Sequence, residues 1–175
     1  MTWTLRAATL ADALPLSVLA TQVWLDTYCA EGVDGSLARE VRHSCGPEAF
    51  EARLREPQRH HLLAERAGGR LQAFVELLPE QAPPLAGLSQ GVEVVRLYVQ
   101  PSAQGQGLGA RMLGAAADWA QAQHQAGLWL TVWSGNARAR RFYARQGWVD
   151  RGPTLLGFEG RSYTNHVLER VLARG

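Results

Sequence analysis

Residues 92–109 have the sequence VEVVRLYVQPSAQGQGLG. Its first part, Val92 to Val99, is rich in β-branched residues and predicts a buried strand. A turn with three glycines follows, and a helix is expected from about Gly107 to Gln123. In that arrangement several backbone N–H groups point at one place, where the helix dipole adds partial positive charge. Because glycine permits positive φ and lets an anion approach the backbone closely, the stretch predicts a pyrophosphate-binding turn.

A dinucleotide-binding fold is the main alternative, because the segment Gly105 to Gly109 superficially resembles its glycine fingerprint. Two features argue against it. The dinucleotide fold places its first glycine at the end of the strand, whereas Gly105 lies well beyond Val99. It also requires an acidic residue at the end of the next strand, and the corresponding run, Leu128 to Ser134, contains none. A turn that uses glycine only for its geometry remains as the other alternative.

The rest of the chain alternates between strand and helix patterns. Expected strands cover residues 3–7, 60–65, 71–78, 92–99, 128–133, 148–156 and 163–172. Expected helices cover residues 9–28, 36–43, 47–55, 107–123 and 136–145. In the first helix Thr9 is the expected N-cap, with Asp12 reaching back to it. The apolar residues Leu14, Val18, Leu19, Val23 and Trp24 keep helical spacing. No repeat or linker is visible, so we expect one α/β domain over residues 1–175.

The composition excludes several classes of protein. All 18 basic residues are arginine, so neither a Walker A phosphate loop nor a Schiff-base lysine is possible. The formal net charge of +2 is too small to predict nucleic-acid binding, and no apolar run approaches the ~20 residues that span a bilayer. The histidines and cysteines lack metal-ligand spacing, and Cys29 and Cys45 are expected to be reduced thiols. No signal peptide is visible at the start, so a cytoplasmic location is expected.

Two motifs resemble those of the GNAT superfamily of acetyl-CoA-dependent N-acetyltransferases. The central family motif, Gln/Arg-x-x-Gly-x-Gly/Ala after a strand, is matched by Gln104 to Gly109. Residues 136–148, NARARRFYARQGW, are similar to the family's Asn-x-x-Ala-x-x-Phe-Tyr-x-x-x-Gly-Phe, with Trp148 in place of the last phenylalanine. Together the motifs cover about residues 92 to 149. The resemblance implies a mixed, mostly antiparallel sheet that is splayed at its centre and has helices on both faces.

The resemblance also implies that acetyl-CoA is the cosubstrate; no metal is expected. In the family, backbone groups of the strand pair with the pantetheine arm and the turn holds the pyrophosphate. Asn136 is expected to hydrogen-bond the arm, to cap its own helix, or to do both. The expected cofactor-binding residues are Leu97, Tyr98, Val99, Gln104, Gly105, Gln106, Gly107, Leu108, Gly109, Asn136, Ala139 and Tyr143.

Two residues are the candidates for proton transfer. Glu93 lies about 20 Å before Val99 along an extended strand, which is comparable to the reach of the pantetheine arm. Similarity to histone-acetylating members implies that Glu93 is the general base. Alternatively Glu93 only pairs with an arginine, and Glu76 or water alone is the base. Tyr143 corresponds to the family tyrosine that protonates the departing thiolate, unless it fills the helix–sheet interface, a place that Phe142 can take instead.

The resemblance therefore implies transfer of an acetyl group from acetyl-CoA to a primary amine of a small molecule or peptide. Direct attack, a general base and a tyrosine general acid are expected. Acidic residues in the expected acceptor loops predict attraction of a cationic amine: Glu31, Asp34, Glu40 and Glu80. The resemblance is also compatible with a homodimer. The alternative function is a non-catalytic acyl-CoA sensor or recruitment module, against which the presence of Glu93 and Tyr143 argues.

Overall fold

The computed structural model describes residues 2–158 and 161–172. The chain divides into two units. The first contains Met1–Glu76 and Arg96–Ala115, and the second contains Leu77–Val95 and Ala116–Gly175. The glycine turn therefore belongs to the first unit, whereas Tyr143 belongs to the second. That one domain spans the whole chain stays a prediction.

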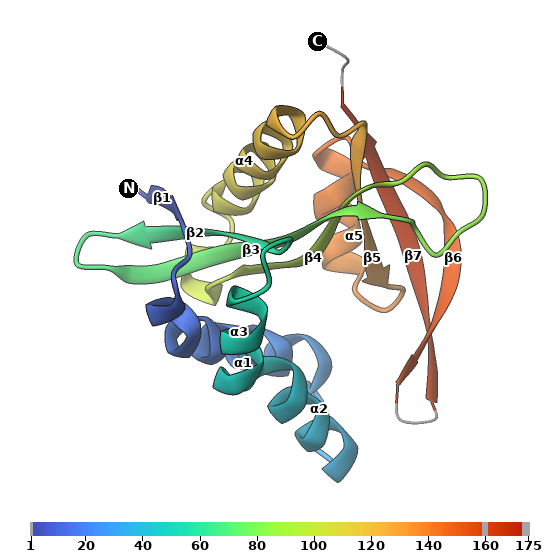
Figure 1. The fold of residues 1–175 in the computed structure, drawn as a ribbon. Helices are drawn as coiled ribbons and strands as arrows, with labels where there is room; N and C mark the ends of the chain where they lie inside the picture. Colours follow the sequence, from blue (N-terminus) through green and yellow to red (C-terminus); the bar gives the residue numbers. More distant parts are fainter. Residues whose placement is uncertain (1, 159–160, 173–175) are drawn as a thin grey trace. The chain divides into compact units, whose positions relative to one another are not determined.

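The strands and helices follow the order expected from the sequence (Figure 1). The strands are β1 (Thr4–Ala7), β2 (His60–Arg66), β3 (Arg70–Gln81), β4 (Gly91–Val99), β5 (Gly127–Trp133), β6 (Val149–Phe158) and β7 (Arg161–Val171). The helices are α1 (Ala13–Tyr28), α2 (Gly35–Cys45), α3 (Pro47–Leu54), α4 (Leu108–Ala122) and α5 (Ala137–Arg145), with short 3-10 turns at Leu10–Asp12 and Pro101–Ala103. The described elements thus agree with the predicted ones to within a few residues at their ends.

The sheet has the strand order β1-β2-β3-β4-β5-β7-β6. Antiparallel ladders join β1 to β2, β5 to β7, and β6 to β7, whereas β4 and β5 are parallel. The parallel ladder contains two residue pairs, Val92 with Leu128 and Glu93 with Trp129, and it ends there although both strands continue. The mixed, mostly antiparallel sheet is confirmed, and the short parallel ladder agrees with the predicted splay.

The 3-10 turn that leads into α1 is capped by the residues that the sequence suggested, Thr9 and Asp12. The Thr9 N–H and hydroxyl both donate to Asp12 Oδ2, at 2.7 and 2.9 Å. Arg6, on β1, donates to both oxygens of Asp12 and also pairs with Glu65 on β2. The guanidinium lowers the pKa of Asp12 to about 2, although partial burial opposes this shift. The cap therefore ties the helix start to the first two strands.

The core of the first unit lies between α1–α3 and strands β2 and β3. These helices gather on one side of the two strands, and the start of α4 lies on the other (Figure 1). Leu16, Phe50 and Phe74 are fully buried, and the two phenyl rings meet edge to face at 5.7 Å. Leu14 and Val18, by contrast, are 62% and 61% exposed.

The apolar stripe that helical spacing predicted for α1 is therefore only partly buried. Helix α1 carries apolar residues on several sides, so periodicity alone does not choose the buried face. The packed face includes Ala13, Leu16 and Ala20, spaced at i, i+3 and i+7. Val23 and Trp24 pack against the same core.

The second unit is built on the antiparallel strands β5, β7 and β6. Leu130 and Leu168 are paired across β5 and β7, and both are buried. Trp148, just before β6, is also buried and packs edge to face against Tyr143 of α5, with ring centroids 5.6 Å apart. Helix α5, with Tyr143, thereby packs into this unit's core.

Candidate functional site

The glycine turn opens helix α4 in the way that an anion-binding turn requires. Gly105 and Gly107 have φ values of 75° and 82°, which are strained for any residue with a side chain. The Gly107 carbonyl accepts from Arg111 N–H at 3.1 Å, so Gly107 is the N-cap and the helix begins at Leu108. A Cβ placed on either glycine would meet no atom within 4 Å. The outer side of the turn is thus open.

Backbone donors are concentrated in this turn. Within the part of the chain that the structure describes, the N–H groups of residues 105–110 donate no well-aligned hydrogen bond to another residue. The first N–H groups of a helix have no intrahelical partner, and the helix dipole makes them an anion site. The turn therefore has the geometry and the unused donors to fit a pyrophosphate.

Side chains of the turn also bond to the end of β4 and to the 3-10 turn that follows it. The Gln104 side-chain amide donates to Val99 O at 3.0 Å, and that of Gln106 donates to Ser102 O at 2.8 Å. The Val99 carbonyl thus already has one partner and keeps one lone pair for another. The sequence predicts that Gln104 binds the cofactor. In the structure, its side-chain amide donates one hydrogen bond within the protein, to the Val99 carbonyl.

Alternate residues of β4 point to opposite faces of the sheet. Arg96 contacts Glu76, and Tyr98 packs against Phe74 with ring centroids 5.4 Å apart. Leu97 and Val99 consequently point to the other face. The Tyr98 ring is half-buried and packs against the core under α1–α3, away from the face of Leu97 and Val99, so any contact that Tyr98 makes with the cofactor involves its backbone.

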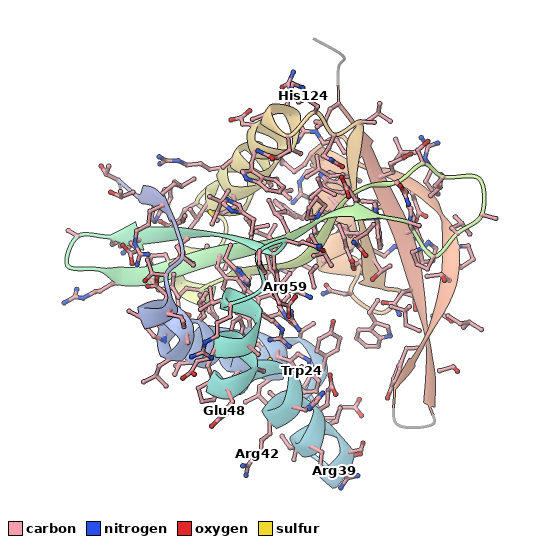
Figure 2. The ribbon with its side chains drawn as sticks, in the orientation of Figure 1. Trp24, Arg39, Arg42, Glu48, Arg59 and His124 are labelled. Carbon is pink, nitrogen blue, oxygen red and sulfur yellow. The ribbon has the colours of Figure 1, made fainter. Side chains whose placement is uncertain are left out.

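The two candidate bases lie in different environments. Glu93 is half-buried in the second unit, and its register partner on β5 is Trp129. Glu76 is fully buried in the first unit, where Arg59 Nη1 and Arg96 Nη1 each lie 2.6 Å from one of its oxygens. Figure 2 shows Arg59 where α3 is followed by β2.

The Glu76 carboxylate is held in its charged form. Burial raises its pKa, but His61 and Arg96 lower that pKa by more, so the net pKa lies well below the ordinary 4.5. His61 Nε2 is 3.7 Å from the carboxylate, beyond hydrogen-bond range, so the two arginines provide its direct contacts. A carboxylate with so low a pKa is a poor proton acceptor near neutral pH.

The second motif places Tyr143 and Asn136 on α5. The Asn136 side-chain oxygen accepts from Ala139 N–H at 3.0 Å, which confirms the predicted helix cap and leaves its NH₂ group for another contact. Tyr143 is 9% exposed, whereas Phe142 is only half-buried. The expectation that Phe142 fills the interface in place of Tyr143 is therefore wrong, because α5 turns Tyr143 toward Trp148 and the core.

The described residues contain neither a metal-ion site nor a membrane-spanning helix. Among them, no group of three or more His, Cys, Asp or Glu side chains is placed to hold a metal ion. None of the helices in residues 2–158 and 161–172 has the length and apolar character needed to cross a membrane. Cys29 is half-buried, Cys45 is buried, and both are free thiols.

Comparison with known proteins agrees with the two motifs. The model of the acetyltransferase (GNAT) family matches residues 24–148. The chain belongs to this family. An uncharacterized N-acetyltransferase of Mycobacterium bovis is 30% identical over 127 residues, which cover 70% of this chain and 74% of that protein. Family membership supports an acyl-CoA-dependent acetyltransferase.

Solved GNAT structures share the fold. The PaiA N-acetyltransferase of Thermoplasma acidophilum, solved in complex with coenzyme A, has a TM-score of 0.73 and 19% identity over 98% of this chain and 100% of its own. The spermidine/spermine N-acetyltransferase of Vibrio cholerae has a TM-score of 0.65 and 18% identity over 97% and 95%. At these identities the structures show the fold class, which is the predicted one, and not the substrate.

Proposed function

We propose that this GNAT protein transfers the acetyl group of acetyl-CoA to a primary amine of a small molecule or peptide. The observation that carries the proposal is the glycine turn that opens α4, where the N–H groups of residues 105–110 make no well-aligned hydrogen bond to the described residues, in the sequence context of the family motif. Acetyl-CoA supplies an acetyl group activated as a thioester. The residues of the chain bind it, orient it and move protons.

Binding is assigned to the two motifs. The N–H groups of Gly105 to Gly109 hold the pyrophosphate, and the backbone of Leu97 to Val99 pairs with the amides of the pantetheine arm, as an unpaired strand edge can. Gln104 positions the end of the strand through its bond to Val99. The free NH₂ group of Asn136 and the backbone of Ala139 complete the contacts on α5.

Proton transfer is assigned to Glu93 and Tyr143. Glu93, directly or through water, takes a proton from the ammonium form of the substrate, because only the neutral amine can attack. The amine nitrogen then bonds to the acetyl carbon and the carbon–sulfur bond breaks. The Tyr143 O–H gives its proton to the sulfur that leaves, and the proton that the amide nitrogen releases passes through water to restore the Tyr143 hydroxyl. The low pKa of Glu76 and its two arginine contacts favour Glu93 over Glu76 as the base.

Replacement of Gly107 by valine tests the turn. A β-branched residue at φ 82° costs about 1–3 kcal/mol, and its side chain would stand in the open space beside the N–H groups. We expect the Kd for coenzyme A, measured by calorimetry, to rise about tenfold or more. Gly114→Ala is the matched control, because Gly114 lies inside α4 with free space around it and alanine suits a helix. Equal Kd values for Gly107→Val and wild type would remove the turn from the binding site.

Replacement of Glu93 by glutamine tests the base. We expect kcat/KM at pH 7 to fall about tenfold and the rising limb of its pH profile to move to higher pH. The loss should shrink at high pH, where the amine substrate is deprotonated in solution. Glu169→Gln is the control, because Glu169 pairs with Arg151 on the neighbouring strand β6. A pH profile identical to that of wild type would exclude Glu93 as the base.

Cellular context completes the proposal. We assign the protein to the cytoplasm, with small-molecule or peptide amines and not nucleic acids as its partners. Free-thiol release from acetyl-CoA over a panel of amines tests the activity itself. Binding of coenzyme A without acetylation of any amine would favour the sensor function instead.

A further inference from the structure

The face of β4 that lies under α1–α3 carries an unusual set of side chains. Arg96 and Tyr98 are two residues apart on β4, so their side chains point to the same face of the sheet. Their contacts on β3, Glu76 and Phe74, are also two residues apart. Arg96 is also adjacent to Leu97, which the proposed function assigns to the pantetheine arm. A group bound by Arg96 is therefore held by the same strand as the arm.

Positive charge exceeds negative charge in this cluster. Arg59 and Arg96 share the single carboxylate of Glu76, and Arg59 also pairs with the more exposed Glu56 at 2.7 Å. Arg53, on α3, adds a third guanidinium. Three arginines thus face two glutamates, and a surplus of positive charge in a partly buried cluster is costly unless an ion of opposite sign compensates it.

Arg53 lies close to the other members of the cluster. Its guanidinium carbon is 5.2 Å from the centre of the Phe50 ring, which contacts Phe74, which in turn contacts Tyr98. Burial lowers the pKa of Arg53, and the nearby charge of Arg96 lowers it further. Within residues 2–158 and 161–172, no carboxylate contacts Arg53; its Nη1 donates to the Ser44 carbonyl at 2.7 Å.

Several donors of the cluster are unused. Arg96 spends Nη1 on Glu76 and Arg53 spends Nη1 on Ser44, and no other described residue accepts from either guanidinium. The Tyr98 hydroxyl likewise makes no hydrogen bond to the residues that the structure describes. Guanidinium groups present paired N–H donors that match the two oxygens of a carboxylate.

We propose that Arg53, Arg96 and Tyr98 bind an anionic group, a carboxylate, of the acceptor amine. The preferred substrates are then amino acids or other amines that carry an acidic group. This inference rests on the proposed acetyl transfer and narrows its substrate class. This substrate class differs from the cationic amine that the acidic residues of the loops predicted, because a polyamine would add positive charge to a cluster that already has an excess of positive charge.

Pairs of amines that differ only in a carboxylate test this selectivity. Suitable pairs are phenylalanine with phenethylamine, tyrosine with tyramine, and methionine with 3-(methylthio)propylamine. We expect wild-type kcat/KM, followed by thiol release from acetyl-CoA, to be higher for the amino acid in each pair. A preference for the decarboxylated amines, or no preference, would overturn the inference.

Variants then connect the preference to the cluster. In Arg53→Gln the ratio of kcat/KM between amino acid and amine should fall about 10- to 100-fold, as expected for the loss of a charged hydrogen-bonding partner. Tyr98→Phe, which keeps the ring against Phe74, should lower the ratio by a smaller factor. Arg55→Gln is the matched control, since Arg55 lies at the end of the same helix and pairs with Glu51 on its exposed side. An unchanged ratio in both Arg53→Gln and Tyr98→Phe would refute the assignment.

The outcomes separate this inference from the proposed function. Calorimetry with coenzyme A and the rate on simple amines report on the acetyltransferase itself. If coenzyme A binds and amines are acetylated without regard to the carboxylate, only the anion site is wrong. If neither binding nor acetylation occurs, the proposed function fails. Calorimetric titration of N-acetylphenylalanine and of N-acetylphenethylamine then decides the anion site alone, because only the acid should bind.

Discussion

Replacement of Tyr143 by phenylalanine is expected to lower kcat about 100- to 1000-fold, with little change in the Kd for coenzyme A. General acids contribute about this much when they protonate a leaving group in the transition state. Phenylalanine keeps the ring that packs against Phe142 and Trp148 and removes only the hydroxyl. The loss should therefore appear in the rate of chemistry and not in folding or binding. Steady-state kinetics with acetyl-CoA, together with calorimetry, measures both quantities.

Tyr163→Phe is the control for this experiment. Tyr163 is a half-buried tyrosine of the same unit, on β7, and it should tolerate the change with kcat within about twofold of wild type. If Tyr143→Phe retains full turnover, Tyr143 is a packing residue and the proton reaches the sulfur from elsewhere. If kcat and melting temperature fall together, the effect is structural, which would also contradict the assignment.

Local sequence signals predicted the parts of the site that depend on neighbouring residues. The turn at Gly105 to Leu108 needs only glycine conformations and the start of a helix, and both are present as expected. The Asn136 cap and the Thr9–Asp12 interaction are likewise decided within three residues. Such features are fixed by steric and hydrogen-bonding rules that act over one turn of chain.

The sequence could not predict which face of α1 is buried, or what surrounds Glu76. Leu14 and Val18 are as apolar as the residues that pack, so the choice of face depends on tertiary contacts. Glu76 meets Arg59 and Arg96, which are 17 and 20 residues away along the chain. Alternation along β4 could have shown that Arg96 and Tyr98 share a face, but the contribution of Arg53 depends on where α3 packs.

These contacts give Glu76 a structural role that can be measured. Glu76→Gln should lower the free energy of unfolding by about 3–5 kcal/mol at pH 7, because it removes one charge from a buried group of ion pairs. Among the described residues, Arg96 then has no carboxylate partner and Arg59 keeps only the exposed Glu56. Glu51→Gln is the control, since the exposed pair of Glu51 with Arg55 should contribute about 0.5 kcal/mol or less. Urea unfolding measures both variants.

The dependence of this difference on pH identifies the charge as its cause. The pKa of Glu76 is lowered in the folded protein, so ionised Glu76 stabilises the fold above the ordinary pKa of 4.5 and loses that contribution as the pH falls toward the folded-state pKa. The gap between wild type and Glu76→Gln should therefore be constant between about pH 6 and 8 and should narrow below about pH 4.5. A gap under 1 kcal/mol at pH 7, or one that does not narrow in acid, would mean that Glu76 is not held as an anion by its arginines. In that case Glu76 would again be as good a candidate as Glu93 for the general base, because its low pKa is what argues against it.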